Sequence, residues 1–144
     1  MMTHTTGSGK PRRPVLGLAL LLWIGAASAL GAEKPALTEE TAKRIAAAAA
    51  AEAQHLGLGI AIVVVDGAGH ILHEEHFGQV PPAAREVALA KARAAYAFER
   101  SLDPPLHGLA PIVAGGQVVG GIGVNSIGTA QQEDQIAAAG ARAL

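Results

Sequence analysis

One stretch of the chain decides the fold: residues 59–77 read GIAIVVVDGAGHILHEEHF. Its first half, Ile60 to Val65, is apolar on both faces, mostly β-branched and too short for a helix of ordinary length. The next four residues, Asp66 to Gly69, are of types that tolerate positive φ or favour tight turns. The stretch therefore predicts a β-hairpin whose first strand is covered on both faces and whose second strand is rich in histidine and glutamate.

Five further elements are expected around this hairpin. They are a capped, Ala-rich helix from Thr38 to Leu56, a helix from Pro81 to about Arg100, two strands at 111–114 and 117–124 joined by Gly115-Gly116, and a helix from Thr129 to Leu144 that opens with a capping box. The order is α-β-β-α-β-β-α. It predicts an α/β fold of the α+β type, with a mostly antiparallel central sheet flanked by helices.

Length and composition limit the choices further. The chain has 144 residues, no cysteine and only four aromatic residues, so we expect one domain with a core of Ala, Val, Ile and Leu. Thin cores of this kind are often supplemented by assembly, which predicts a homo-oligomer. Without residues 1–32, the chain has 8 basic and 12 acidic residues, a formal charge of −4. This charge argues against a nucleic acid as partner.

The first 32 residues have the order of a secretory signal peptide. Lys10, Arg12 and Arg13 precede an uncharged apolar run, and small residues follow at Ala27-Ser28-Ala29. The pair Arg12-Arg13 also resembles the twin-arginine export signal, with an ordinary charged leader as the alternative. We expect residues 1–32 to be removed and residues 33–144 to form a periplasmic or secreted domain that does not contact the membrane after cleavage.

Glu74 and His76 are candidate metal ligands on the second strand of the hairpin. Alternate residues of a strand share a face, so Glu74 and His76 project one way and His73 and Glu75 the other. Strand spacing excludes the helical His-Glu-x-x-His zinc motif. The alternative to a metal pair is a solvated edge strand or a subunit contact.

Lys91 is anomalous because it stands in an apolar stripe of the second helix, with Val87, Ala88, Ala95 and Phe98 at helical spacing. A lysine in such a place must pair with a carboxylate, cap a carbonyl or meet an anionic ligand. Pairing is the simplest interpretation, because buried lysines usually have structural partners.

His107 stands in the irregular segment between the second helix and the third strand, beside Gly108. A neutral imidazole held in such a loop can ligate iron, and the alternative is a surface histidine.

The residues from Leu37 to Leu144 resemble the haem-binding HbpS-like family, which includes the GlcG proteins and the C-terminal domain of PduO adenosyltransferases. The resemblance lies in Leu37-Thr38-Glu39-Glu40, the run from Val65 to His70, Ala88 to Ala92 through Phe98, Pro111-Ile112, the run from Gly120 to Val124, and the closing helix around Asp134. It implies an antiparallel α/β fold, assembly and, in some members, binding of haem or a corrinoid. The chain departs from the usual family pattern at residues 76–80, so no axial ligand transfers by position.

The leading hypothesis is an exported, non-catalytic protein that binds haem or a related tetrapyrrole, with a corrinoid or iron as other ligands. His107 or His76 would ligate iron, and Lys91 or Arg93 would meet a propionate. One alternative is an accessory subunit that assembles without a ligand. Another is a small enzyme acting on an organic acid, with Lys91 as the anchor and a histidine as acid or base.

Overall fold

The computed structural model describes residues 35–97 and 106–144, together with residues 7 and 9. Residues 34–144 form one compact unit. Its elements are α1 (Glu39–His55), β1 (Ile60–Asp66), β2 (Ile71–Phe77), α2 (Ala84–Ala97), β3 (Leu109–Ala114), β4 (Gln117–Ser126) and α3 (Ala130–Ala141). The predicted order and fold class are confirmed. The expected signal peptide lies outside the described residues, apart from residues 7 and 9.

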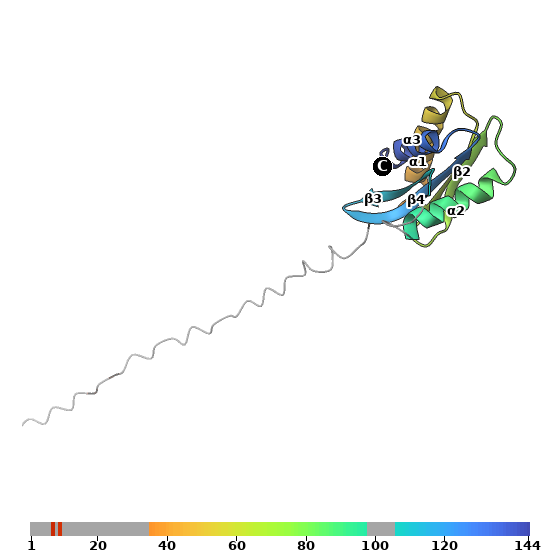
Figure 1. Cartoon of the computed structure of the whole chain (residues 1–144). Coiled ribbons are helices and arrows are strands. Elements are labelled where there is room, and N and C mark those ends of the chain that lie inside the picture. The colour runs from red at the N-terminus through yellow and green to blue at the C-terminus, as the bar shows by residue number, and fades with distance from the viewer. Residues whose placement is uncertain (1–6, 8, 10–34, 98–105) are drawn as a thin grey trace, which may run out of the picture. The chain divides into compact units, whose positions relative to one another are not determined.

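The four strands form one antiparallel sheet in the order β2-β1-β4-β3, with α1 and α3 on one face and α2 on the other (Figure 1). The central strand β1 is buried on both faces, as its composition predicts. Ile60, Ile62 and Val64 pack in the core beneath α1 and α3, whereas Val63 and Val65 pack against α2. Burial of each such side chain contributes about 1.5 to 3 kcal/mol, so β1 is the centre of both hydrophobic cores.

Helices α1 and α3 begin where their caps predict. The Thr38 hydroxyl accepts a hydrogen bond from the Thr41 N–H at 3.1 Å at the start of α1. At α3, Thr129 and Gln132 form the predicted capping box, each side chain bonding the other's backbone N–H. The start of α2 differs from the prediction, because the Ala84 N–H closes a turn on the Pro81 carbonyl and the helix begins only at Ala84.

Two other boundaries differ as well, because β3 pairs with β4 from Leu109 onward and β4 pairs with β1 as far as Ser126. Strand β3 begins at Leu109 rather than Pro111, and β4 continues to Ser126 rather than Val124. On α2, Val87 was expected in the buried stripe but is 38% exposed. The buried residues are Ala84, Ala88, Ala92 and Ala95, and Phe98 lies outside the described residues.

Helix α2 lies against β4 with almost no side chain between the two backbones. A Cβ at Gly121 would overlap the Ala92 carbonyl oxygen, and a Cβ at Gly123 would overlap the Ala88 carbonyl oxygen and the Ala92 nitrogen. Glycines inside a strand indicate a close approach of a backbone or a flat ligand. At these two glycines, the neighbour is the backbone of α2.

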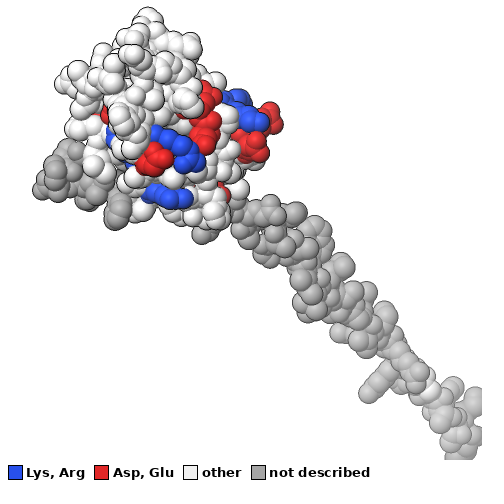
Figure 2. All heavy atoms as spheres, turned by 90° about the vertical axis from the view of Figure 1, so that its right-hand side faces the viewer, with Lys and Arg blue, Asp and Glu red and all other residues white. Residues whose placement is uncertain are grey.

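The surface of this unit is mixed in charge where Figure 2 displays it. Basic and acidic side chains lie beside one another on that face, next to a wide uncharged area, among the residues drawn in colour (Figure 2). Among the described residues, no helix is both long and apolar enough to cross a membrane.

The Gly123→Ala variant tests the close packing of α2 on β4. The added methyl group overlaps two backbone atoms of α2, so the helix must move, and we expect a loss of about 3 kcal/mol in the free energy of unfolding. Ala90→Ser, at an exposed position of the same helix, should change stability by less than about 0.5 kcal/mol. Urea denaturation of both variants measures the difference, and a Gly123→Ala protein as stable as the control would contradict this packing.

A second prediction concerns the turn between β1 and β2. Asp66 Oδ1 accepts the backbone N–H groups of Ala68 (2.8 Å) and His70 (2.9 Å). Burial alone would raise the pKa of the Asp66 carboxyl, but these two hydrogen bonds and the nearby His70 ring outweigh it and lower the pKa. A carboxyl whose pKa is lower in the folded state stabilises the fold above its unfolded pKa, and this stabilisation is lost as the pH falls through the folded pKa.

The wild-type protein should therefore exceed Asp66→Asn in stability by roughly 1 kcal/mol at neutral pH. The difference should shrink below about pH 4, the unfolded pKa of aspartate. Urea denaturation of both proteins between pH 7 and pH 2 checks the trend. A difference that stays constant over this range would show that the charge of Asp66 does not stabilise the turn.

Candidate functional site

The candidate site lies at the outer edge of β4, where β3 has not yet begun. The first residue of β3, Leu109, pairs with Gly123, whereas β4 continues through Val124 to Ser126. On its other side, β4 remains paired with β1 over these residues. The outward-facing backbone groups of Val124 and Ser126 therefore need partners other than a strand, because unpaired buried backbone groups are costly.

Two charged side chains and one loop carbonyl supply those partners. Lys91 Nζ donates to the Val124 carbonyl at 2.9 Å, and the Val124 N–H donates to the Gly108 carbonyl at 2.8 Å. The Ser126 N–H donates to Glu133 Oε1 at 2.6 Å. Lys91 and Glu133 thus replace the hydrogen bonds that a longer β3 would have made.

Lys91 and Glu133 also pair with each other. Lys91 Nζ lies 2.8 Å from Glu133 Oε2, and the two side chains are only 15% and 9% exposed. Lys91 comes from α2 on one face of the sheet and Glu133 from α3 on the other, so the ion pair joins the two helical layers around the edge of β4. This contact confirms the structural interpretation of Lys91, which proposed a carboxylate or a carbonyl as its partner, and Lys91 has both.

Gly108 lies directly over this ion pair. Its φ is +74°, and a Cβ there would lie 2.9 Å from each of three atoms: Lys91 Nζ, Glu133 Oε2 and the Val124 carbonyl oxygen. Both the backbone conformation and the lack of space require glycine at this position.

His107 is held by a carboxylate beside the ion pair. Asp134 accepts the Gly108 N–H on Oδ1 at 2.8 Å, and its Oδ2 lies 2.6 Å from His107 Nδ1. A carboxylate only accepts hydrogen bonds, so Nδ1 carries the proton and donates it. In the neutral ring, Nε2 is then a free electron-pair donor. Because His107 is 45% exposed, a ligand can reach it.

Two exposed apolar side chains flank this site in the chain. Ile127 is 66% exposed and follows Ser126, and Leu106 is 50% exposed and precedes His107. They are the two most exposed of the large hydrophobic residues that the structure describes. The edge of the sheet therefore combines an accessible imidazole with apolar surface.

His76 and Glu74 lie at the opposite edge of the sheet. They share the α2-side face of β2, and His73 and Glu75 share the other face, where they pair at 2.9 Å. Glu74 pairs with Arg85 at 2.8 Å, which raises the pKa of that guanidinium. Among the described residues, no group of three or more His, Cys, Asp or Glu side chains is placed to hold a metal ion.

The two candidate haem ligands are not brought together within one chain. His76 is on β2 and His107 lies just before β3, and β1 and β4 separate these strands. With neighbouring strands about 4.8 Å apart, the separation across the sheet is roughly 14 Å. A pocket of about 270 Å³ adjoins His76, between β1, β2 and Arg85.

Arg93 lies away from both histidines. Its Nε donates to the Gly69 carbonyl at 3.1 Å, in the turn between β1 and β2. Lys91 and Arg93 therefore reach opposite sides of α2, and of the two only Lys91 adjoins the His107 loop.

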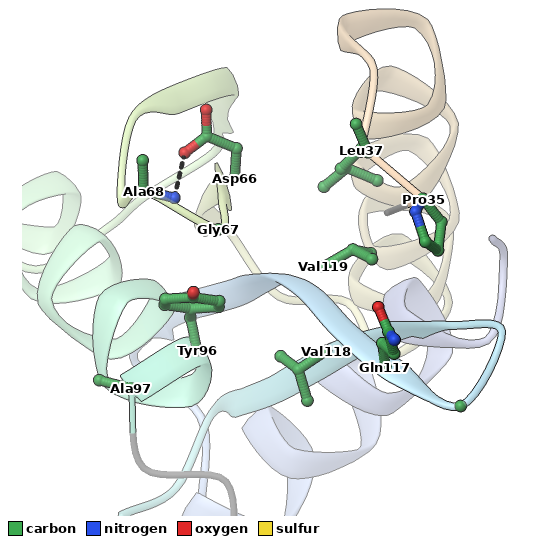
Figure 3. A pocket seen from close by; sticks show the side chains of 12 residues that line it. Pro35, Leu37, Asp66, Gly67, Ala68, Tyr96, Ala97, Gln117, Val118 and Val119 are labelled. Carbon is green, nitrogen blue, oxygen red and sulfur yellow. Dashed lines mark hydrogen bonds between the residues drawn. The ribbon is translucent and has the colours of Figure 1, made fainter. Parts of the chain in front are cut away.

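A larger pocket, of about 790 Å³, lies at the other end of the strands (Figure 3). Tyr96 of α2 borders one side, Leu37 lies across from it, and the Asp66 turn and Gln117 complete the border (Figure 3). Neither His76 nor His107 lines it.

Comparison with known proteins supports the resemblance seen in the sequence. A model of the family described as "Haem degrading protein HbpS-like" matches residues 37–103. The solved structure of a double mutant of HbpS from Streptomyces reticuli is 28% identical, with a TM-score of 0.70, and the match covers 78% of this chain and 89% of that one. These matches support an HbpS-like family for this chain.

Two more distant structures share the fold of this chain at 20% identity. Klebsiella pneumoniae protein ORFY has a TM-score of 0.69, with 78% of this chain and 94% of that chain covered. PduOC, solved as a complex with haem, also has a TM-score of 0.69, with 76% and 96% covered. Among curated proteins, none matches this chain.

Sequence reasoning missed Glu133 and Asp134 as site residues. A signal for Glu133 was present, because it repeats at helical spacing with Ile136, Ala137 and Gly140, the buried residues of α3. A lone acid in one apolar stripe and a lone lysine in another are natural partners. Asp134 carries no such signal, since it is 45% exposed and its role depends on where the His107 loop runs.

The Gly108→Ala variant tests whether the loop that carries His107 lies directly on the Lys91–Glu133 ion pair. Gly116 is a matched control, because its φ of +75° is nearly the same and a Cβ there would meet nothing within 4 Å. Gly116→Ala should cost about 1 kcal/mol for the left-handed backbone alone. Gly108→Ala should cost roughly 1 to 3 kcal/mol more, because the methyl group crowds three polar atoms. Equal losses in urea denaturation would mean that the loop is not seated there.

Proposed function

We propose that this HbpS-like protein binds haem, or a closely related tetrapyrrole, with His107 Nε2 as the axial ligand of the iron. One observation carries the proposal: His107 Nδ1 lies 2.6 Å from Asp134 Oδ2, and Asp134 is itself held by the Gly108 N–H. Histidines that ligate metals almost always donate their second ring N–H to a carboxylate, a carbonyl or water, which sets the tautomer and raises the basicity of the ligating nitrogen.

The donor set at this edge fits haem. A single imidazole is the commonest proximal ligand of haem iron, and a carboxylate behind it tunes the iron. The apolar side chains of Leu106 and Ile127 provide surface for the faces of a flat macrocycle. When bound, haem would supply a redox-active iron, and His107, Asp134 and Gly108 would hold it.

The relatives support the ligand class. PduOC has been solved with haem, and the description of the matching family model, which refers to HbpS, is of a haem-degrading protein. An HbpS structure is 28% identical to this chain. We limit the proposal to binding without turnover, because the ionisable groups next to His107 are already bonded to the protein's own backbone and side chains. Lys91 and Glu133 hold the edge of β4, and Asp134 holds the His107 loop.

His76 is the second candidate ligand, favoured by the pocket that it lines with Arg85. Arg85 could meet a propionate there, in place of the Lys91 or Arg93 expected from the sequence. The two sites lie at opposite edges of the sheet, so single variants separate them. A corrinoid would use the same imidazole chemistry and is distinguished by its own spectrum.

Export and assembly complete the proposal. The order of residues 1–32 supports removal of a signal peptide and a periplasmic or secreted location, and the Ala-rich core supports a homo-oligomer. N-terminal sequencing of the protein recovered from a bacterial periplasm would support export, and its absence there would contradict it.

Haem titration of the full chain tests the ligand and the site together. We expect a saturable Soret shift, a loss of at least about tenfold in affinity for His107→Ala, and a loss of roughly 10- to 100-fold for Asp134→Asn. Imidazole added to His107→Gly should restore the wild-type spectrum, because it replaces the missing ligand.

His76→Ala is the matched control and should bind as the wild type does. If His76→Ala loses the shift and His107→Ala keeps it, the site is on β2 and our assignment is wrong. A wild-type protein that shows no Soret shift, or a shift unchanged in the double variant His76→Ala/His107→Ala, would contradict histidine-ligated haem.

A further inference from the structure

We propose that the buried ion pair Lys91–Glu133 is the positioning device for His107: it holds the imidazole in one tautomer and orientation from beneath the loop. The consequence for ligand binding rests on the proposed haem function. The effect on the tautomer and orientation of the His107 ring does not depend on haem binding, because the ion pair holds the ring in the protein without a ligand.

The surface contacts of His107 are too weak to orient it alone. His107 and Asp134 are each 45% exposed. Exposed charged pairs contribute only about 0 to 1 kcal/mol, because water competes for both partners. A ring held by such a contact would sample other orientations unless its backbone and its acceptor were fixed by something buried.

The ion pair fixes the acceptor through α3. Glu133 ends the first turn of that helix and directly precedes Asp134, so the bonds of Glu133 to Lys91 and to the Ser126 N–H set where Asp134 projects. Glu133 Oε1 also accepts the Ser126 hydroxyl at 3.2 Å. The first turn of α3 is thereby attached to both α2 and β4.

The ion pair also fixes the loop backbone through Gly108. A Cβ on Gly108 would lie 2.9 Å from both Lys91 Nζ and Glu133 Oε2, so this residue leaves no room for a side chain above the pair. Its backbone is bonded on both sides: the N–H to Asp134 and the carbonyl to the Val124 N–H. The Val124 carbonyl in turn accepts the hydrogen bond from Lys91 Nζ. Donor and acceptor of the His107–Asp134 hydrogen bond are therefore both built on the same buried pair.

Glu133→Gln is the sharpest variant, because the amide keeps the shape and an acceptor oxygen for Ser126 while removing the charge that holds Lys91. Lys91→Met removes the other partner. Lys43→Met is the matched control: Lys43 also pairs with a glutamate, Glu39, at 3.1 Å, but its side chain is 56% exposed and it lies on α1.

The measurement is the tautomer of His107 in the full chain without ligand, by ¹⁵N NMR of the imidazole nitrogens, followed by haem titration. In the wild type and in Lys43→Met we expect one dominant tautomer with the proton on Nδ1. In Glu133→Gln and Lys91→Met we expect a mixture of tautomers and, if haem binds, roughly tenfold weaker affinity. Asp134→Asn serves as the reference for a ring that has lost its carboxylate.

A His107 ring that keeps its wild-type tautomer in both ion-pair variants would overturn the proposal. If Lys91→Met does not fold, the double variant Lys91→Met/Glu133→Gln, which leaves no unpaired buried charge, gives the same test. Failure of the wild type to bind haem would contradict the proposed function and leave the tautomer result standing, so the two outcomes are distinguishable.

Discussion

The structure depends on one ion pair that stands in for a missing piece of strand. β4 is longer than β3, and at its unpaired end the Lys91 ammonium and the Glu133 carboxylate bond its backbone while bonding each other. Ion pairs taken out of water are often no more stabilising than apolar residues would be. Apolar residues could not replace this pair, because they could not form hydrogen bonds with the backbone groups of Val124 and Ser126. Its position is therefore dictated by the hydrogen bonds of the sheet.

The reach of Lys91 to that edge follows from the way α2 packs. Gly121 and Gly123 have no side chains to hold α2 away, so the helix lies on the backbone of β4 through small alanines. In this close arrangement the Lys91 Cβ adjoins Gly123, and the lysine chain extends past the strand toward α3. With larger residues in place of the glycines, the helix would lie farther out and the ammonium would not reach the Val124 carbonyl. The ion pair thus depends on the glycines of β4.

Much of the fold could be predicted because its signals are local. The β-branched run at 60–65, the Gly-rich turns and the Thr129–Gln132 box each depend on a few neighbouring residues, and all three are confirmed. The error at Val87 has a physical cause: in a helix composed largely of alanine, the apolar stripe is poorly defined, and contact with the strand glycines selects which side is buried. The site was only half predictable. Lys91 and His107 stood out singly, but their partners are 42 and 27 residues away, and such pairings are set by how α3 packs on the sheet.

The placement of His107 shows why an exposed ligand and a buried support belong together. A ring that must bind an incoming molecule has to be accessible, yet an accessible ring held only by surface contacts pays an entropic cost when the ligand fixes it. Here the ring is exposed, its acceptor is one residue from a buried carboxylate, and the next residue in the chain lies on the same ion pair. His76 lacks this support, because Glu74 on the same face of β2 is engaged by the exposed Arg85 rather than by a buried charged group. The difference in support, more than the difference in accessibility, is what makes His107 the stronger candidate.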